Sequence, residues 1–172
     1  MAFVPLLALA QEPPDAVVVT ATRAPHSALE VPASVDRIDG QEIREDRQQV
    51  NLSESLGRVP GIAVLNRQNY AQDLQVQSRG YGARSTFGVR GIRLVADGIP
   101  ATMPDGQGQA ATFSLSSADH IEVLRGPFSA LYGNSSGGVI ALETMDAPNE
   151  PTGEADLLFG SYGTWRAGLR FG

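Results

Sequence analysis

The chain has 172 residues, of which 42% are hydrophobic and 19% charged, so it is long enough for one folded domain with its own core. Its formal charge of −6 argues against nucleic acid as a partner, because proteins that bind phosphate backbones carry a basic field. Cysteine and lysine are absent and only two histidines occur, which excludes disulfides, thiolate metal sites and Schiff-base chemistry and disfavours a histidine-rich metal site. We therefore expect no metal site and no bound cofactor.

The N-terminal part divides into an apolar run and a proline-flanked segment. Residues 1–10 end in a small-x-small pattern at Ala8 and Ala10, which is typical of the end of an export signal peptide. A basic region before this run is missing, so we expect a partial signal peptide, with a frayed apolar N-terminus as the alternative. Residues 11–32 contain a β-branched run that should be extended and has no visible partner strand nearby: Asp15, Ala16, Val17, Val18, Val19, Thr20 and Ala21.

Residues 33–150 have the pattern of an α+β domain with short helices around a small sheet. A polar helix is predicted after Gly40 with Ile43 as its buried residue, and a second helix over residues 51–60 is capped by Asn51 or Ser53. Residues 127–132 fit one helical turn. Short β-prone runs separated by glycine-rich turns are predicted at residues 34–39, 62–65, 74–79, 92–96, 121–125 and 139–144.

Residues 151–172 follow a different pattern, with two alternating faces. Trp165, Ala167, Leu169 and Phe171 share one face, while Thr164, Arg166, Gly168 and Arg170 share the other. This alternation is expected of a strand in a transmembrane β-barrel, and residues 155–159 would complete a hairpin. We expect the start of a barrel that continues beyond this sequence. The alternative is an ordinary amphipathic hairpin packed on the domain.

Five motifs occur along the chain in a fixed order. They are the run at residues 15–21, the Leu-Gly-Arg-Val-Pro-Gly-Ile element within residues 52–64, Gln-Ser-Arg-Gly at 77–80, Asp-Gly-Ile-Pro at 97–100, and Leu-Arg-Gly-Pro with the following glycine-rich strand at 121–144. In this order they resemble the plug domain of TonB-dependent outer-membrane transporters, from Asp15 to the C-terminus. Gln77 departs from the family pattern, which usually has an apolar residue there.

The resemblance implies a plug that blocks the lumen of a barrel of about 22 strands. Residues 15–21 resemble the TonB box, the segment that TonB pulls from the periplasm, and an extended valine run suits pairing with a partner's sheet edge. The alternative is a structural edge strand of the plug; the absence of a local partner strand favours coupling. The implied partners are TonB, the chain's own C-terminal β-barrel, outer-membrane lipid and a metal chelate. The implied location is the bacterial outer membrane, with the TonB box facing the periplasm.

Two arginines occupy family positions that pair with carboxylates on the barrel wall: Arg79 and Arg125. A guanidinium suits this role because it stays charged when partly buried and binds a carboxylate with two hydrogen bonds. Both arginines could instead find partners within the plug, and for Arg79 the two possibilities are nearly equal. Glu122 lies three residues before Arg125 in one strand, so it should face the opposite way and meet another arginine of the plug.

The segment from residue 67 to residue 93 holds five arginines against a single acid, Asp73, although the chain is acidic as a whole. A local positive field beside aromatic residues suits an anionic chelate such as a ferric siderophore or ferric citrate, and Tyr70, Arg84 and Asp105 are the candidate ligand contacts. Alternatively, these arginines face acids of the barrel, which we favour for Arg90 and Arg93. Zinc, copper, cobalamin, nickel and oligosaccharides stay open as cargoes of the family.

Two rival classes of function remain. An enzyme is disfavoured because the glycine-rich turns at residues 80–82 and 133–138 do not fit a nucleotide-binding pattern, and Asp97 and Asp105 each precede a turn glycine, so we expect no catalytic residues. The second rival is a plug-like periplasmic binding module without any barrel. Many alternating strands encoded after residue 172 would favour the transporter, and a stop codon would favour the module.

Overall fold

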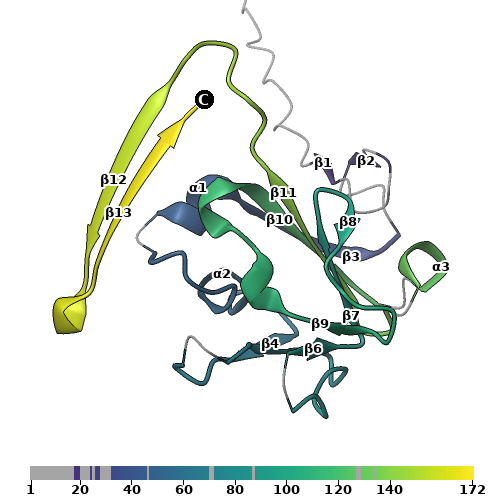
Figure 1. Cartoon of the computed structure of the whole chain (residues 1–172). Coiled ribbons are helices and arrows are strands. Elements are labelled where there is room, and N and C mark those ends of the chain that lie inside the picture. The colour runs from purple at the N-terminus through teal and green to yellow at the C-terminus, as the bar shows by residue number, and fades with distance from the viewer. Residues whose placement is uncertain are drawn as a thin grey trace, which may run out of the picture.

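A computed structural model describes residues 18–19, 24, 26–27, 32–45, 47–69, 72–86, 88–126, 129–133 and 135–172. The apolar run at residues 1–10 and most of the predicted TonB box therefore lie outside the described residues. The described residues form a small mixed sheet with a few short helices, and this confirms the α+β fold expected from the sequence (Figure 1). Two of the candidate site residues, Glu122 and Arg125, lie in a strand of this sheet.

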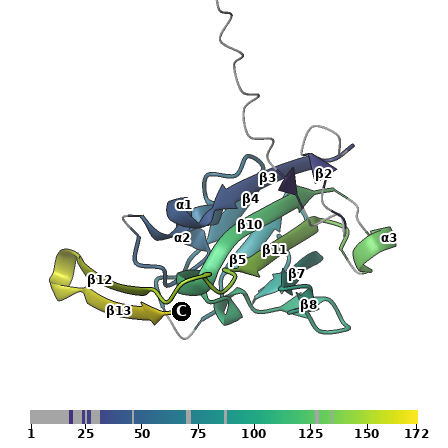
Figure 2. The ribbon, with the colours of Figure 1, turned by 90° about the horizontal axis from the view of Figure 1, so that it is seen from above.

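The sheet has five strands in the order β3 (Ser34–Asp39), β10 (Ala118–Arg125), β11 (Gly138–Thr144), β7 (Ile92–Ala96) and β8 (Ile99–Pro100). Figure 2 shows these strands side by side, with β3 at one edge and β8 at the other. All neighbouring pairs are antiparallel except β11 and β7, which are parallel. In the register of β3 on β10, Ser34 lies opposite Arg125, and Arg37 lies opposite Glu122.

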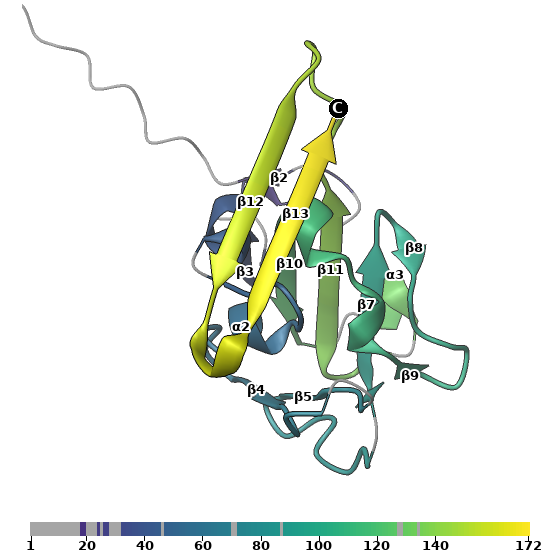
Figure 3. The ribbon, with the colours of Figure 1, turned by 60° about the vertical axis from the view of Figure 1, so that its left-hand side comes forward.

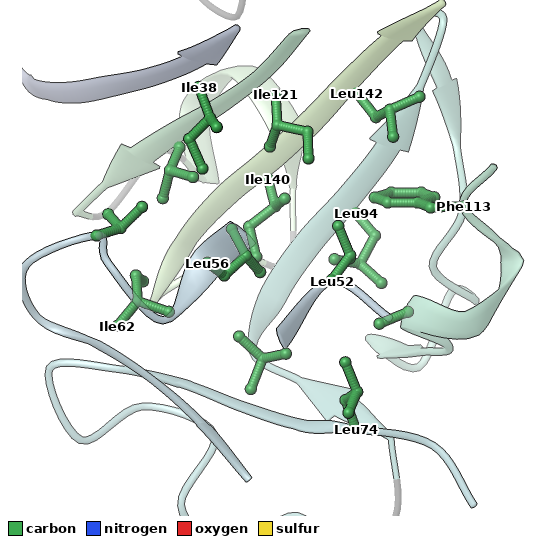
Figure 4. Close-up of a cluster of buried hydrophobic side chains, with 14 of the residues drawn as sticks. Ile38, Leu52, Leu56, Ile62, Leu74, Leu94, Phe113, Ile121, Ile140 and Leu142 are labelled. Atoms are coloured by element: carbon green, nitrogen blue, oxygen red, sulfur yellow. The ribbon is translucent and has the colours of Figure 1, made fainter. Parts of the chain in front are cut away.

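The main core lies between one face of this sheet and the elements that cover it. Because side chains alternate along a strand, Ile121 and Val123 of β10 face this core, while Leu124 faces a smaller cluster on the opposite side. Burial of such side chains is the dominant favourable contribution to folding. The main core shown in Figure 4 includes Ile38, Leu52, Leu56, Ile62, Leu74, Leu94, Phe113, Ile121, Ile140 and Leu142.

The covering elements are short. They are α1 (Gly40–Arg44), α2 (Ser53–Leu56), the β4 (Ile62–Leu65) and β5 (Gln75–Ser78) hairpin, and the pair β6 (Val89–Arg90) and β9 (Gln107–Gly108). The remaining short elements are three 3₁₀ turns, Ala110–Thr112, Leu115–Ser117 and Ser161–Gly163, and the helix α3 (Ser129–Tyr132). Both predicted helices exist, and Ile43 is buried as expected, but each helix is only about one turn long.

The predicted cap of the second helix was wrong. Its N-cap position is Leu52, and no side chain caps it. Instead, the carboxylate of Glu54 accepts hydrogen bonds from three successive backbone N–H groups, those of Gln49, Val50 and Asn51, at 2.8 to 3.0 Å. The loop wraps back onto Glu54, because one carboxylate offers several acceptor sites to donors that would otherwise be unpaired.

Strands β12 (Gly153–Phe159) and β13 (Trp165–Phe171) form an antiparallel hairpin that extends beside the sheet domain (Figures 1 and 3). The alternation predicted from the sequence is visible in its exposure. Leu157, Phe159, Trp165, Leu169 and Phe171 are 70% to 80% exposed, whereas Arg166 and Arg170 are half-buried on the other face. The hairpin thus presents one continuous apolar face away from the domain.

Candidate functional site

The first candidate element is the N-terminal run, of which the structure describes β1 (Val18–Val19). This strand pairs antiparallel with β2 (His26–Ser27), so that Val18 lies opposite Ser27 and Val19 opposite His26. The expectation that this run has no partner strand nearby was therefore wrong. The pairing could not be predicted from the sequence, because a two-residue strand that includes His26 is too short to show an alternating pattern. Asp15, Ala16, Val17, Thr20 and Ala21 lie outside the described residues.

A cluster of charged side chains lies along the seam between β3 and β10, and we call Arg37, Asp119, His120 and Glu122 the seam cluster. Arg37 Nη1 lies 3.9 Å from Glu122 Oε1, and Arg37 Nη2 lies 3.7 Å from Asp119 Oδ2. His120 Nδ1 lies 2.7 Å from Asp119 Oδ2, and His120 Nε2 lies 3.4 Å from Glu122 Oε1. The Glu122 side chain is fully buried, so its charge depends on these neighbours rather than on water.

The seam cluster changes the acidity of its histidine. The adjacent Glu122 carboxylate raises the pKa of His120 above 6.5 and Asp119 raises it further, against the opposing effects of burial and of Arg37. His120 Nε2 lies within ion-pair distance of Glu122 but is not aligned for a hydrogen bond with any described residue. His120 Nδ1, in contrast, lies within hydrogen-bonding distance of Asp119. On the neighbouring strand β11, burial and then the charge of Asp97 raise the pKa of Glu143.

Sequence reasoning placed Glu122 opposite to Arg125 and near an arginine of the same domain, and the structure has this arrangement, with Arg37 as the arginine. It missed Arg37, Asp119 and His120. No local signal could have found them, because the register of β3 on β10 decides which residue lies across from Glu122.

The two arginines of the family motifs come together around one turn. Arg125 forms an ion pair with Asp36 of β3, and its Nη1 donates a hydrogen bond to the carbonyl oxygen of Pro60 at 2.5 Å. A side chain built on Gly61 would lie 3.6 Å from Arg79 Cγ and 3.8 Å from Arg125 Nη1. The exposed Arg79 side chain forms no ion pair within the described part of the chain. Two guanidinium groups therefore flank the Pro60 and Gly61 turn beside a single carboxylate.

The loops that carry two of the proposed ligand contacts, Arg84 and Asp105, lie at the end of the domain away from β1 and β2 (Figures 1 and 3). Arg84 is exposed in the turn after β5, and Asp105 lies in the turn before β9, where its Oδ2 is 3.7 Å from Arg90 Nη2. Tyr70 lies outside the described residues. Arg67 is held between two loops, since it donates hydrogen bonds to Gln72 Oε1 at 3.3 Å and to the Thr86 carbonyl at 2.9 Å. The structure shows no contact between Arg84 and Asp105 among the described residues.

A wide groove of about 1360 Å³ lies elsewhere, between the polar face of the hairpin and α1 with the loop that follows it. Its lining mixes charges of both signs, including Arg44, Asp156 and Arg166. Arg170 closes one side of it, because Nη1 donates to the Ser116 carbonyl at 3.1 Å while Nη2 pairs with Glu154. None of the described residues that the sequence marked for ligand binding lines this groove.

Two features are absent from the described residues. Their histidine, aspartate and glutamate side chains form no group of three that could hold a metal ion. None of their helices is both long and apolar enough to span a membrane.

A family model of the TonB-dependent receptor plug domain matches residues 27–139, and the chain belongs to this family. Over 77% of its length it is 33% identical to a hemin receptor of Yersinia pestis, of which it covers 19%. Over 90% of its length it is 31% identical to a vitamin B12 transporter of Photobacterium profundum, of which it covers 24%. The resemblance seen in the five motifs is thereby confirmed. The chain spans about a fifth to a quarter of the length of these relatives.

Solved structures agree on the fold. The pyoverdine outer membrane receptor FpvA of Pseudomonas aeruginosa, bound to pyoverdine, has a TM-score of 0.68 and 23% identity over 88% of this chain and 21% of that receptor. The copper transporter OprC has a TM-score of 0.58 and 23% identity over 80% of this chain and 21% of that transporter. The named relatives are receptors and transporters rather than enzymes.

Proposed function

We propose that this chain is the gate of a TonB-dependent outer-membrane transporter for a scarce chelated nutrient, and that TonB opens the gate by pulling on residues 15–21. In this proposal residues 1–10 are part of a signal peptide, 11–32 the TonB-box segment, 33–150 the plug and 151–172 the start of the barrel. The plug lies inside the barrel in the outer membrane, with the TonB box toward the periplasm.

One observation carries the proposal: the described part of the coupling segment and the arginine-rich loops lie at opposite ends of one small sheet domain (Figures 1 and 3). A gate needs this separation, because cargo arrives on one side of the membrane and the pull on the other. The pairing of β1 with β2 covers only two residues on each strand, and so short a hairpin is marginally stable. A partner strand could therefore replace β2 at low cost.

The cargo we propose is an anionic iron chelate, a ferric siderophore or ferric citrate. Support comes from the excess of arginine on the loops, since Arg84 is exposed there and Arg90 shares the single nearby acid Asp105. One relative is named a hemin receptor and another a vitamin B12 transporter. Hemin is therefore included as a further ligand in the binding test.

Arg79 and Arg125 support the same picture. Two guanidinium groups beside one carboxylate leave positive charge available, and we propose that a barrel carboxylate pairs with Arg79 when the plug is seated. A plug-like binding module without a barrel is the alternative; the sequence encoded after residue 172 distinguishes the two.

The coupling role is tested in the complete receptor by measuring energised uptake and binding of labelled chelate. Deletion of residues 15–21 should abolish uptake and leave binding intact. A sharper variant is Val18→Pro, which removes a backbone donor needed for strand pairing, with Val18→Thr as the matched control that keeps it. Uptake that persists in the deletion would contradict the assignment.

The cargo site is tested with ferric citrate, a ferric siderophore and hemin. Arg84→Ala should weaken binding of the true cargo by about tenfold, as expected for loss of one charged hydrogen bond worth about 1.5 kcal/mol. Arg47→Ala, an arginine outside these loops, is the matched control and should leave affinity unchanged. Equal affinities for Arg84→Ala and the unmodified protein would remove Arg84 from the site.

A further inference from the structure

Strand β3 is the edge strand through which the N-terminal segment joins the sheet. Its outer side has no neighbour in the five-stranded sheet, and its inner side pairs antiparallel with β10. The register places Ser34 opposite Arg125 and Asp39 opposite His120. A pull on the chain that precedes Ser34 therefore reaches β3 at the end paired with Arg125, and would separate the strands from that end.

Separation of β3 from β10 starting at this end would break two side-chain contacts, one after the other. The first is the ion pair of Arg125 with Asp36, on the side of the sheet where Arg125 also binds the Pro60 carbonyl. The second is the contact of Arg37 with Glu122 in the seam cluster, one residue further along β3 and on the opposite face. Both faces of the seam are thus held by charges from β3.

The second contact differs from the first in burial. The difference lies in the carboxylates: the side chain of Glu122 is 0% exposed and that of Asp36 is 30% exposed, whereas their arginines Arg37 and Arg125 are 23% and 12% exposed. Withdrawing Arg37 would leave the Glu122 carboxylate in a dry site with only part of its positive surroundings, those of His120 on the same strand, and removing one partner of a buried charge is unfavourable. Resistance to separation should therefore rise sharply when the opening reaches Arg37, the fourth residue of β3.

We propose that the seam cluster is a clasp that limits how far β3 is peeled from β10 when the N-terminal segment is pulled. Residues before Arg37 come away first, and the remaining sheet moves as one body until the clasp opens. The proposal rests on the proposed function only for the origin of the pull. The clasp itself is a property of the β3 and β10 seam.

The clasp is tested by pulling single molecules of the 172-residue chain at constant force. The sequence contains no cysteine, so Ile99→Cys provides a unique anchor on β8, where this side chain is 69% exposed. One geometry pulls the N-terminus against this anchor and loads β3. The second geometry pulls the C-terminus against the same anchor and loads the chain after β11 instead.

Glu122→Gln keeps the shape and removes the charge. In the N-terminal geometry we expect it to shorten by about tenfold the lifetime of the state in which the residues before Arg37 have separated and the clasp still holds; the C-terminal geometry should be unchanged. Glu150→Gln is the matched control, because Glu150 is exposed and lies after β11, away from β3 and from the seam cluster. It should change neither geometry. A fall of equal size in both geometries, or no fall in either, overturns the clasp.

A second measurement covers the case in which Glu122→Gln folds poorly. Arg37→Lys keeps the positive charge but lacks the guanidinium fork, and should increase hydrogen exchange of β3 amides while β11 amides keep their protection. Unchanged exchange in β3 contradicts the clasp. Neither measurement uses cargo or TonB. A result that contradicts the clasp therefore leaves the coupling role of residues 15–21 untouched, because the uptake test decides that role separately.

Discussion

Glu54 shows how a single side chain can fix a loop that local preferences leave open. Its carboxylate receives the backbone N–H groups of Gln49, Val50 and Asn51, and these donors lie between α1 and α2. Charged acceptors form stronger hydrogen bonds than neutral ones. The loop is therefore ordered by a residue that follows it in the sequence rather than by a conventional cap.

We expect Glu54→Gln to lower the free energy of unfolding by about 1 to 3 kcal/mol, because an amide oxygen accepts more weakly than a carboxylate and its NH₂ group would face three donors. Denaturant unfolding monitored by circular dichroism measures this loss. Glu45→Gln is the matched control, since Glu45 is exposed and close to the same loop. Equal stability of the two variants would show that the carboxylate does not organise the loop.

His120 makes stability depend on pH in a defined direction. Its pKa is raised by contact with Glu122, so the folded protein holds the proton more tightly than the unfolded chain. The resulting stabilisation is fully present below pH 6.5 and is lost as the pH rises through the higher pKa of the folded state.

We accordingly expect the free energy of unfolding to fall as the pH is raised from about 6 to about 8. His120→Gln should remove this dependence, while His26→Gln, which changes the only other histidine, should retain it. Urea unfolding at a series of pH values measures the slope. A slope that survives in His120→Gln would place its origin elsewhere.

At the scale of the elements, close approach of backbones decides where β10 and β11 can pair. Gly138 opens β11 with a φ of 127°, and a Cβ at this position would lie 2.2 Å from the carbonyl oxygen of Leu124 on β10. A side chain here is therefore excluded both by conformation and by space.

Gly138→Ala should lower the free energy of unfolding by at least about 2 kcal/mol, since strain and a backbone clash act together. Gly98→Ala is the control for conformation alone: its φ is 74°, and a Cβ there meets nothing within 4 Å. It should cost about 1 kcal/mol. Similar midpoints of denaturant unfolding for the two variants would contradict the role of the β10 contact.

At the scale of the whole molecule, the β12 and β13 hairpin exposes an apolar face that the sheet domain does not cover. Its outward side chains include Phe159, Trp165 and Phe171. Contiguous exposed apolar surface marks contact with a membrane or with another protein surface. In the proposed transporter this face meets lipid, whereas the half-buried Arg166 and Arg170 face inward.

Trp165 is the only tryptophan in the chain and reports on this face directly. We expect its fluorescence emission to shift to shorter wavelength when phospholipid vesicles are added, because the indole moves from water to an apolar environment. Leu169→Gln, on the outward face, should weaken the shift, and Leu158→Gln, on the inward face, should not. Emission that is unaffected by vesicles would contradict assignment of residues 151–172 to a membrane barrel.

Much of this organisation could be predicted from the sequence because it is encoded locally. Period-two alternation gave the two faces of the hairpin at Trp165 and its neighbours, and short β-branched runs gave most strands of the sheet. The order of the five motifs indicated the plug family, which the family match over residues 27–139 confirms. Strand β2 and the Glu54 loop were missed because neither has a periodic pattern.

The sequence alone determined the class of domain and the positions of its longer strands, because propensity and alternation act over neighbouring residues. Only the tertiary structure decided that Arg37 meets Glu122, that Arg79 and Arg125 flank one turn, and that the arginine-rich loops lie at the opposite end from β1. These placements depend on the pairing register of strands far apart in the chain. A shift of one residue in that register would turn Arg37 to the other face of the sheet and separate it from Glu122.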